Sequence, residues 1–399
     1  MGTSAADPAI TWPLAASSWG PEEIAALQEV IASGQFTMGP KVKEFEAAFA
    51  AHLGMKHAVM VNSGSSANLI ATAALFHTAK RALARGDECI VPAISWATTY
   101  HPLQQYGLKL KFLDVELDTL NVDCCLLERA LGPRTKALMA VSILGNPAAL
   151  DVMRDFCDRH GLWFIEDNCE SLDAELNGRK AGSFGDLTTH SFFFSHHMST
   201  MEGGMVTTND LELAHLCRAL RAHGWTRDLP PDSPIYTRTG SDFFEAYRFI
   251  LPGYNVRPLE MSAAVGLEQL RKLPAMIARR RANLAHFQKL FGGDDRFITP
   301  RENGRSSSFT FPIILNPKYR FDREQVFAAL RAAGIQYRII TGGNMLRHDV
   351  MKFYDYEIVG NGCPNADIAH DHGFFVGNHP HDLTAQIDTL RTVLDRVCR

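Results

Sequence analysis

The sequence has little that would place the protein on a nucleic acid or in a membrane. Its 399 residues carry 40 Lys and Arg against 44 Asp and Glu, so there is no positive excess for a nucleic-acid or lipid surface. The apolar runs are short and interrupted, so we expect no membrane-spanning segment. The first 18 residues lack a basic segment followed by an apolar core. We therefore predict a flexible lead-in, no signal peptide and a cytoplasmic location.

The sequence also lacks the cysteine spacing of a metal site. None of its eight cysteines stands in Cys-x-Cys or Cys-x-x-Cys spacing, and several lie in apolar or helical-looking runs. We predict buried, reduced thiols and no metal ion. With 46% hydrophobic and 21% charged residues, the composition is that of a globular protein long enough for two lobes.

An alternation of strands and helices predicts the fold class. Between residues 55 and 210, β-rich runs such as HAVMVNS, ECIVPAI and LWFIEDN alternate with segments of helical periodicity, over residues 67–85 and 151–160. Such repetition predicts a mostly parallel sheet covered on both faces, of seven strands once SFFF and GGMVTTN are included. We thus predict an α/β protein with a large domain over residues 1–265 and a smaller α+β domain over residues 266–399.

Polar and aromatic residues follow the ends of these strands, and we expect them to converge, because ligands bind beyond the carboxyl ends of parallel strands. In VNSGSSANL a strand runs into a helix start, where backbone N–H groups and the Ser65 and Ser66 hydroxyls could hold a phosphate. A plain serine-capped helix start is the alternative. Trp96, just past another strand, could stack on a planar cofactor, or be a core residue.

Two further strand ends carry candidate chemistry. Asp167 directly follows the apolar run LWFIE, where its carboxylate could keep a ring nitrogen protonated and make the ring an electron sink. A solvated acidic loop is the alternative. In HSFFFSHHMSTMEGGMV, Ser191 could be another phosphate donor, and His196 and His197 follow it closely beside the same expected pocket.

These segments, in this order, resemble the sugar aminotransferase family of fold-type I pyridoxal phosphate enzymes, which act on nucleotide-linked keto-sugars. The resemblance extends from about Ile24 to Cys398. In that family a lysine after the SF dipeptide binds the cofactor, whereas His196 occupies the place here. With its surroundings SHHMSTMEGGM, SWATTYHPLQQYG, YRFILPGYNVRPLEMS and GFFVGNHP, this substitution is similar to a narrower branch, the pyridoxamine phosphate-dependent 3-dehydratases of GDP-4-keto-6-deoxy-mannose.

Histidine differs from lysine in a way that changes the expected reaction. An imidazole cannot anchor an aldehyde, and no lysine occurs between Lys180 and Lys272, so we expect an untethered pyridoxamine 5'-phosphate rather than a bound pyridoxal 5'-phosphate. Histidine can take and return a proton near neutral pH. The resemblance thus implies a dehydratase that removes the C3 hydroxyl of a nucleotide-linked 4-keto-6-deoxy sugar. His196 would be its sole acid and base, and L-glutamate would restore the cofactor amine.

The resemblance also implies roles for other residues of the large domain. Gly64, Ser65 and Ser191 would hold the cofactor phosphate, and Trp96 would pack on the ring. Glu170 stands where many relatives carry a glutamine that contacts the ring hydroxyl.

Three residues further along the chain complete the implied site. His223 would approach the sugar, and Asn255 and Arg257 would reach the cofactor phosphate of a neighbouring subunit. A homodimer with shared active sites is therefore implied, although a surface ion pair is the alternative for Arg257.

Other functions stay open at this point. An aminotransferase acting on the same substrates would need a lysine that binds the cofactor. An iron–sulfur-assisted dehydratase would need a cysteine group with a close pair, and the adjacent Cys124 and Cys125 do not have the Cys-x-Cys spacing. A non-catalytic protein that binds pyridoxal phosphate could also have lost the lysine.

Overall fold

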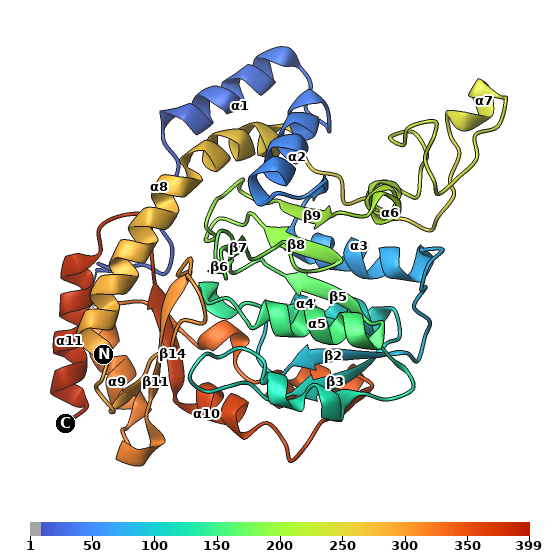
Figure 1. Cartoon of the computed structure of the whole chain (residues 1–399). Helices are drawn as coiled ribbons and strands as arrows, with labels where there is room; N and C mark the ends of the chain where they lie inside the picture. Colours follow the sequence, from blue (N-terminus) through green and yellow to red (C-terminus); the bar gives the residue numbers. More distant parts are fainter. Residues whose placement is uncertain (1–8) are drawn as a thin grey trace, which may run out of the picture.

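A computed structural model describes residues 9–399 of the chain (Figure 1). Its main feature is an eight-stranded sheet of order β1-β9-β8-β5-β4-β2-β3-β13, in which only β9 runs antiparallel to its neighbours. In that order the strands are β1 (His57–Val61), β9 (Gly204–Thr208), β8 (Leu187–Ser191), β5 (Trp163–Asp167), β4 (Thr135–Val141), β2 (Glu88–Pro92), β3 (Lys109–Leu113) and β13 (Tyr356–Ile358). The predicted fold class is confirmed. Seven strands come from the region expected to supply them, and β13 from the C-terminal part adds an eighth.

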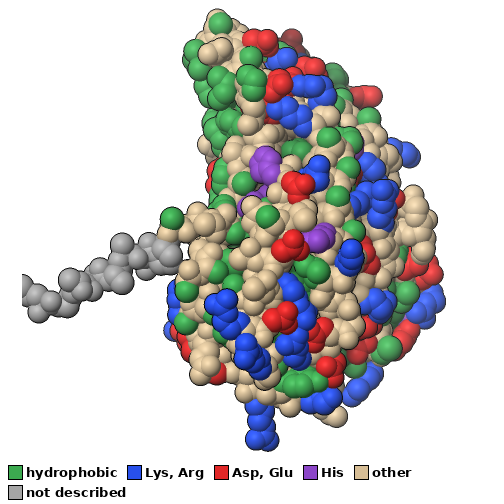
Figure 2. Space-filling model, turned by 90° about the vertical axis from the view of Figure 1, so that its left-hand side faces the viewer, with side chains coloured by type: hydrophobic (Ala, Val, Ile, Leu, Met, Phe, Trp, Pro, Cys, Tyr) green, Lys and Arg blue, Asp and Glu red, His purple; other side chains and the backbone are tan. Residues whose placement is uncertain are grey.

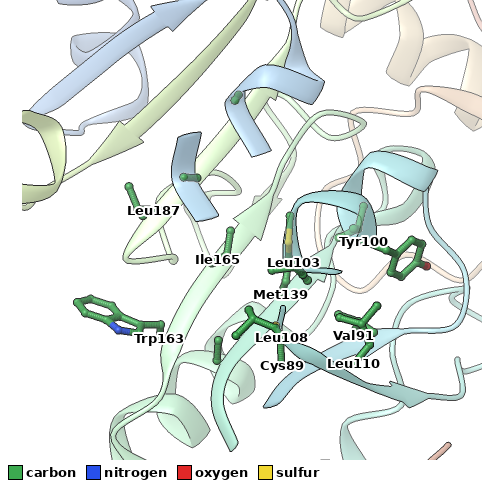
Figure 3. Close-up of a cluster of buried hydrophobic side chains, with 14 of the residues drawn as sticks. Cys89, Val91, Tyr100, Leu103, Leu108, Leu110, Met139, Trp163, Ile165 and Leu187 are labelled. Atoms are coloured by element: carbon green, nitrogen blue, oxygen red, sulfur yellow. The ribbon is translucent and has the colours of Figure 1, made fainter. Parts of the chain in front are cut away.

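Both faces of this sheet are buried, which explains why its strands are apolar at consecutive positions. On β2, Cys89 and Val91 belong to one hydrophobic cluster and Ile90 to another, because successive side chains point to opposite faces. The first face packs against α3 (Gly64–His77), α4 (Ala97–Gln105) and α6 (Leu211–Arg221), and the second against α5 (Leu150–His160). Figure 3 shows Tyr100 and Leu103 of α4 lying over the first face.

The C-terminal part builds a second, antiparallel sheet. Its order is β10-β11-β14-β12, with bounds β10 (Phe297–Ile298), β11 (Thr310–Leu315), β14 (Gly373–Gly377) and β12 (Tyr337–Arg338). A hydrophobic cluster joins it to α8 (Glu260–Phe291), α9 (Arg323–Ala332) and α11 (Thr384–Val397). α8 runs unbroken from α1 (Pro21–Ser33) and α2 (Pro40–Leu53) to α11 (Figure 1). A division of the chain after residue 265 stays a proposal, and it falls inside this helix.

Smaller elements complete the description. They are α7 (Asp242–Glu245), α10 (Pro364–His372) and the hairpin β6 (Glu175–Leu176) and β7 (Arg179–Lys180). α7 lies in a segment that projects from the body (Figure 1). Among residues 9–399, no helix combines the length and the apolar character needed to cross a membrane.

Three local predictions differ from the structure. α3 begins at Gly64 rather than residue 67, because Ser63 caps it by accepting a hydrogen bond from the Ser66 amide. β8 ends at Ser191, opposite the first residue of β9, so SFFF lies largely beyond the strand. The first eight residues of the predicted flexible lead-in lie outside the described residues. Its later part is packed, because Trp12 is buried and its Nε1 donates to the Gly377 carbonyl at 2.9 Å.

Candidate active site

A cavity of about 540 Å³ opens at the carboxyl ends of β2, β5 and β8, where the sequence predicts that strand-end residues converge. Seven of the predicted site residues line it: Gly64, Ser65, Trp96, Asp167, Glu170, Ser191 and His196. Asp167 and Ser191 are the last residues of β5 and β8, and Trp96 precedes the first residue of α4. The parallel sheet therefore brings residues far apart in the sequence to one place.

The first turn of α3 forms one end of the cavity. It presents backbone N–H groups and the Ser65 hydroxyl beside Ser191, at the positive end of a 14-residue helix. Two glycines allow the close approach. A Cβ on Gly64 would lie 2.6 Å from Ser191 Cβ, and one on Gly204 would lie 2.2 Å from the Ser63 carbonyl oxygen. This is a suitable cradle for a phosphate group.

Asp167 is held in a fixed orientation at the base of the cavity. Its Oδ2 accepts hydrogen bonds from Asn68 Nδ2 at 2.9 Å and Thr99 Oγ1 at 2.8 Å, and its Oδ1 accepts one from the Cys169 amide at 3.2 Å. Asn68 is itself fixed by the Thr189 hydroxyl, which donates to its Oδ1 at 2.6 Å. The carboxylate is therefore positioned by groups on four segments and faces the cavity.

Glu170 lies beside Asp167 and is also buried. Its Oε2 accepts a hydrogen bond from the Leu144 amide at 2.8 Å. Burial, reinforced by the charge of Asp167, raises the pKa of Glu170 to about 7. Near neutral pH this side chain is therefore partly protonated, and in that form it can donate a hydrogen bond as a glutamine does.

His196 presents its imidazole to the cavity from the loop between β8 and β9. The ring packs against Phe309 with 5.1 Å between ring centroids, and its Nδ1 is buried without a hydrogen-bond partner among residues 9–399. Burial, and secondly the charge of Arg280, lowers the pKa of His196 to about 4. The imidazole is therefore unprotonated at neutral pH and able to accept a proton.

No lysine is among the residues that line this cavity within the described part of the chain. Lys180, the nearest upstream lysine in the sequence, lies elsewhere. Its Nζ is 2.8 Å from Asp173 Oδ1 and 2.9 Å from His52 Nε2. The cavity thus combines a phosphate cradle, a fixed carboxylate, an indole and a proton acceptor, without an amine that could tether an aldehyde. These features fit pyridoxamine 5'-phosphate.

The residues that line the cavity do not include His223, Asn255 or Arg257. All three are exposed, on the chain that enters and leaves the projecting segment. The His223 amide donates to the Tyr254 carbonyl at 2.7 Å, and Arg257 Nε donates to Asn255 Oδ1 at 3.0 Å. A role at a neighbouring subunit's site stays a prediction for Asn255 and Arg257, as does an approach to the sugar for His223.

Some residues of the site are not evident from the sequence. Asn68 could be noticed as a polar residue on an otherwise alanine- and leucine-rich helix face, and Thr99 as a hydroxyl in the first turn of the helix that follows Trp96. Phe309, Arg338 and Thr341 carry no such signal. They come from the C-terminal part of the chain, and only the packing of that part on the large sheet brings them to the cavity.

Comparisons with known proteins agree with this description. Residues 18–395 match the profile of the DegT/DnrJ/EryC1/StrS aminotransferase family. GDP-4-keto-6-deoxy-D-mannose 3-dehydratase of Yersinia pseudotuberculosis is 48% identical over 97% of this chain and 99% of its own. The structure is similar to that of the E. coli GDP-4-keto-6-deoxy-D-mannose-3-dehydratase with bound hydrated PLP. The TM-score is 0.95 and the sequences are 46% identical, over 97% of this chain and 100% of the other. The structure is also similar to that of a GDP-4-keto-6-deoxymannose-3-dehydratase with a trapped PLP-glutamate geminal diamine. The TM-score is 0.94 and the sequences are 46% identical, over 96% of this chain and 100% of the other.

Proposed function

Because the chain belongs to the DegT/DnrJ/EryC1/StrS aminotransferase family, we propose that it acts on a nucleotide-linked 4-keto-6-deoxy sugar, as a dehydratase rather than an aminotransferase. The reaction removes the C3 hydroxyl and gives a 4-keto-3,6-dideoxy sugar, and the relatives at 46–48% identity favour GDP-4-keto-6-deoxy-D-mannose as the substrate. The proposal rests on one observation: His196, a proton acceptor, lines the cavity, whereas a transaminating relative needs an amine at this place. No lysine of the described residues lines the cavity.

Pyridoxamine 5'-phosphate would supply an amine for the sugar ketone and a ring that withdraws electrons. The Gly64–Ser65 turn and Ser191 would hold its phosphate, and Trp96 would pack on its ring. Asp167, fixed by Asn68, would face the ring nitrogen and keep it protonated. Glu170 in its protonated form would donate to the ring hydroxyl.

His196 would carry both proton transfers. As an unprotonated imidazole it would remove a proton from the carbon next to the cofactor ring, and as the resulting imidazolium it would protonate the departing C3 oxygen. One residue can serve as base and then as acid if both events take place on the same face of the cofactor. L-Glutamate would restore the cofactor amine, in keeping with the glutamate adduct named for a related structure.

The active unit in this proposal is a homodimer with shared sites. The end of the molecule that carries α1 shows gathered hydrophobic side chains (Figure 2), and Ile24, Ile31 and Phe36 are about half exposed there. Four exposed aromatic side chains also lie on the projecting segment, shortly before Asn255 and Arg257 in the sequence: Phe243, Phe244, Tyr247 and Phe249. Apolar surface of this kind commonly marks a subunit contact.

We also expect a cytoplasmic enzyme. All eight cysteines lie in the described part of the chain and are free, and five of them are buried, as expected for a reducing compartment.

Incubation of the purified protein with pyridoxamine phosphate and GDP-, CDP- or dTDP-linked 4-keto-6-deoxy sugars tests the proposal. Ammonia release with a product lacking the C3 oxygen, seen by mass spectrometry, is the expected result, and the panel identifies the nucleotide. An amino sugar formed from glutamate, or a cofactor attached to the resting protein through a borohydride-reducible bond, would establish an aminotransferase instead. Cofactor binding with neither product would indicate a non-catalytic protein.

A further inference from the structure

Behind the candidate base lies a buried arginine that pairs with no carboxylate of residues 9–399. Arg280, in the middle of α8, is only 3% exposed. Its Nη1 donates to two backbone carbonyls, Phe309 at 3.1 Å and Asn378 at 2.6 Å, and its Nε has no partner among residues 9–399. Burial lowers the pKa of Arg280 to about 10, so the guanidinium keeps its charge at neutral pH. A buried charge is costly when no opposite charge pairs with it, so the position of this guanidinium calls for an explanation.

The contacts of Arg280 lead to His196. Phe309, whose carbonyl Arg280 holds, packs its ring against both His196 and His197, at 5.1 and 5.3 Å between ring centroids. Asn378 reinforces the arrangement, because its Nδ2 donates to the Arg280 carbonyl at 3.1 Å and to the Ser308 carbonyl at 3.0 Å. α8, the start of β11 and the end of β14 are thereby fixed to one another behind the imidazole.

We propose that Arg280 is a positioning residue for His196, which orients the imidazole through Phe309 and places a positive charge without a counter-ion among residues 9–399 behind it. The expected effect of Arg280 on turnover rests on the proposed function, whereas its effect on the orientation and pKa of His196 does not. The charge is the second cause, after burial, of the low pKa of His196, and the same charge acts on His197 and His379.

The other ionisable groups near His196 do not replace this effect. Arg338, Glu202, Asp167 and Glu170 line the same cavity. The carboxylates of Glu202 and Asp167 would favour the protonated imidazole, and Glu170 would do so only in its ionised form. The buried guanidinium acts on His196 in the opposite sense. Burial and, after it, this charge keep His196 a free base before the first proton transfer.

Titration of the histidine ring signals by NMR tests the proposal without turnover, with His196 assigned from the spectrum of His196→Asn. In Arg280→Met the pKa of His196 should rise by about one unit, a tenfold change in its protonation constant. The acid limb of the kcat profile should move to higher pH by the same amount. Arg281→Met is the matched control. Arg281 is the neighbouring charge on α8, and its Nη2 lies 3.5 Å from Glu175 Oε1. Its charge does not act on His196, so Arg281→Met should leave the pKa of His196 unchanged.

Arg280→Lys covers the case in which Arg280→Met does not fold. An ammonium keeps the charge, but the lysine side chain ends one bond short of the Nη1 position that holds both carbonyls. The pKa of His196 should therefore stay low while kcat falls and KM for the nucleotide sugar does not change. An unmoved His196 pKa in folded Arg280→Met, or unaltered kcat in Arg280→Lys, would overturn the proposal. A protein without dehydratase activity but with the expected NMR shift would refute the proposed function alone.

Discussion

Asn68 Nδ2 lies 2.9 Å from Asp167 Oδ2, so a helix that starts at the phosphate cradle also fixes the carboxylate at the base of the cavity. Both residues are almost fully buried. The helix thereby links two parts of the candidate site, because α3 supplies the phosphate-binding turn at Gly64 and, one turn later, the amide that orients Asp167. A cofactor held at the phosphate end would thus meet a carboxylate whose direction is already set.

Asp167→Asn should abolish most of the activity while leaving the fold intact. The amide cannot stabilise a protonated ring nitrogen, and its NH2 group would oppose the Asn68 or Thr99 donors. By analogy with the loss of other preorganised electrostatic groups, we expect kcat to fall on the order of 100-fold or more. Steady-state kinetics and circular dichroism measure the two effects. Asp118→Asn, at an exposed ion pair with Arg301, should match the unaltered protein.

His196→Asn should abolish dehydration and retain cofactor affinity, because it removes the proton acceptor with little change in volume. General acid–base groups contribute about 10²- to 10⁴-fold, and we expect a loss at the upper end of that range because one residue carries both transfers. Ammonia release measures turnover, and fluorescence titration measures pyridoxamine phosphate binding. His286→Asn, at a partly exposed pair with Asp388, is the control. Turnover retained by His196→Asn would reject His196 as the base.

His196→Lys should convert the site into one that holds the cofactor covalently. The new amine would stand where the imidazole now lines the cavity, so pyridoxal phosphate should give a yellow protein whose colour is fixed by borohydride. Absorbance and intact-protein mass spectrometry before and after reduction detect the adduct. If no adduct forms, position 196 does not face the reactive carbon of the cofactor.

The sequence predicts the parts of this site that follow from local pattern. Strand ends such as Asp167 and Ser191 can be located from apolar runs, and the parallel-sheet rule then predicts that they converge. Contributions made across long sequence separations cannot be predicted in this way. β13 is a three-residue strand that pairs with β3 nearly 250 positions earlier, and Arg280 looks like one of several charges on a long helix. Their places depend on how the C-terminal part packs against the sheet.

Glu170 should make stability depend on pH near neutrality. Its pKa is about 7 in the folded protein against an ordinary 4.5, so the folded state holds the proton more tightly. The resulting stabilisation is full below pH 4.5 and is lost as the pH rises through 7. Relative to Glu170→Gln, which stays neutral, the unfolding free energy should therefore fall by up to about 3 kcal/mol over this range.

Urea unfolding at several pH values measures this difference, with Glu268→Gln, at a surface pair with Arg271, as the control. A difference between the Glu170 variant and the unaltered protein that does not change with pH would contradict the assignment.

Gly64→Ala should damage the phosphate cradle specifically. The added Cβ would lie 2.6 Å from Ser191 Cβ and 3.1 Å from Cys169 Sγ, so either Ser191 or the first turn of α3 must move. Overpacking of this kind costs about 1–3 kcal/mol of stability, and a displaced Ser191 should also weaken cofactor binding. Gly240→Ala is the matched control, because its Cβ would meet no atom of the described residues within 4 Å. Thermal unfolding and pyridoxamine phosphate titration of both variants separate the two effects. Equal behaviour of the two variants would mean that the close approach of α3 to β8 is not needed to hold the phosphate.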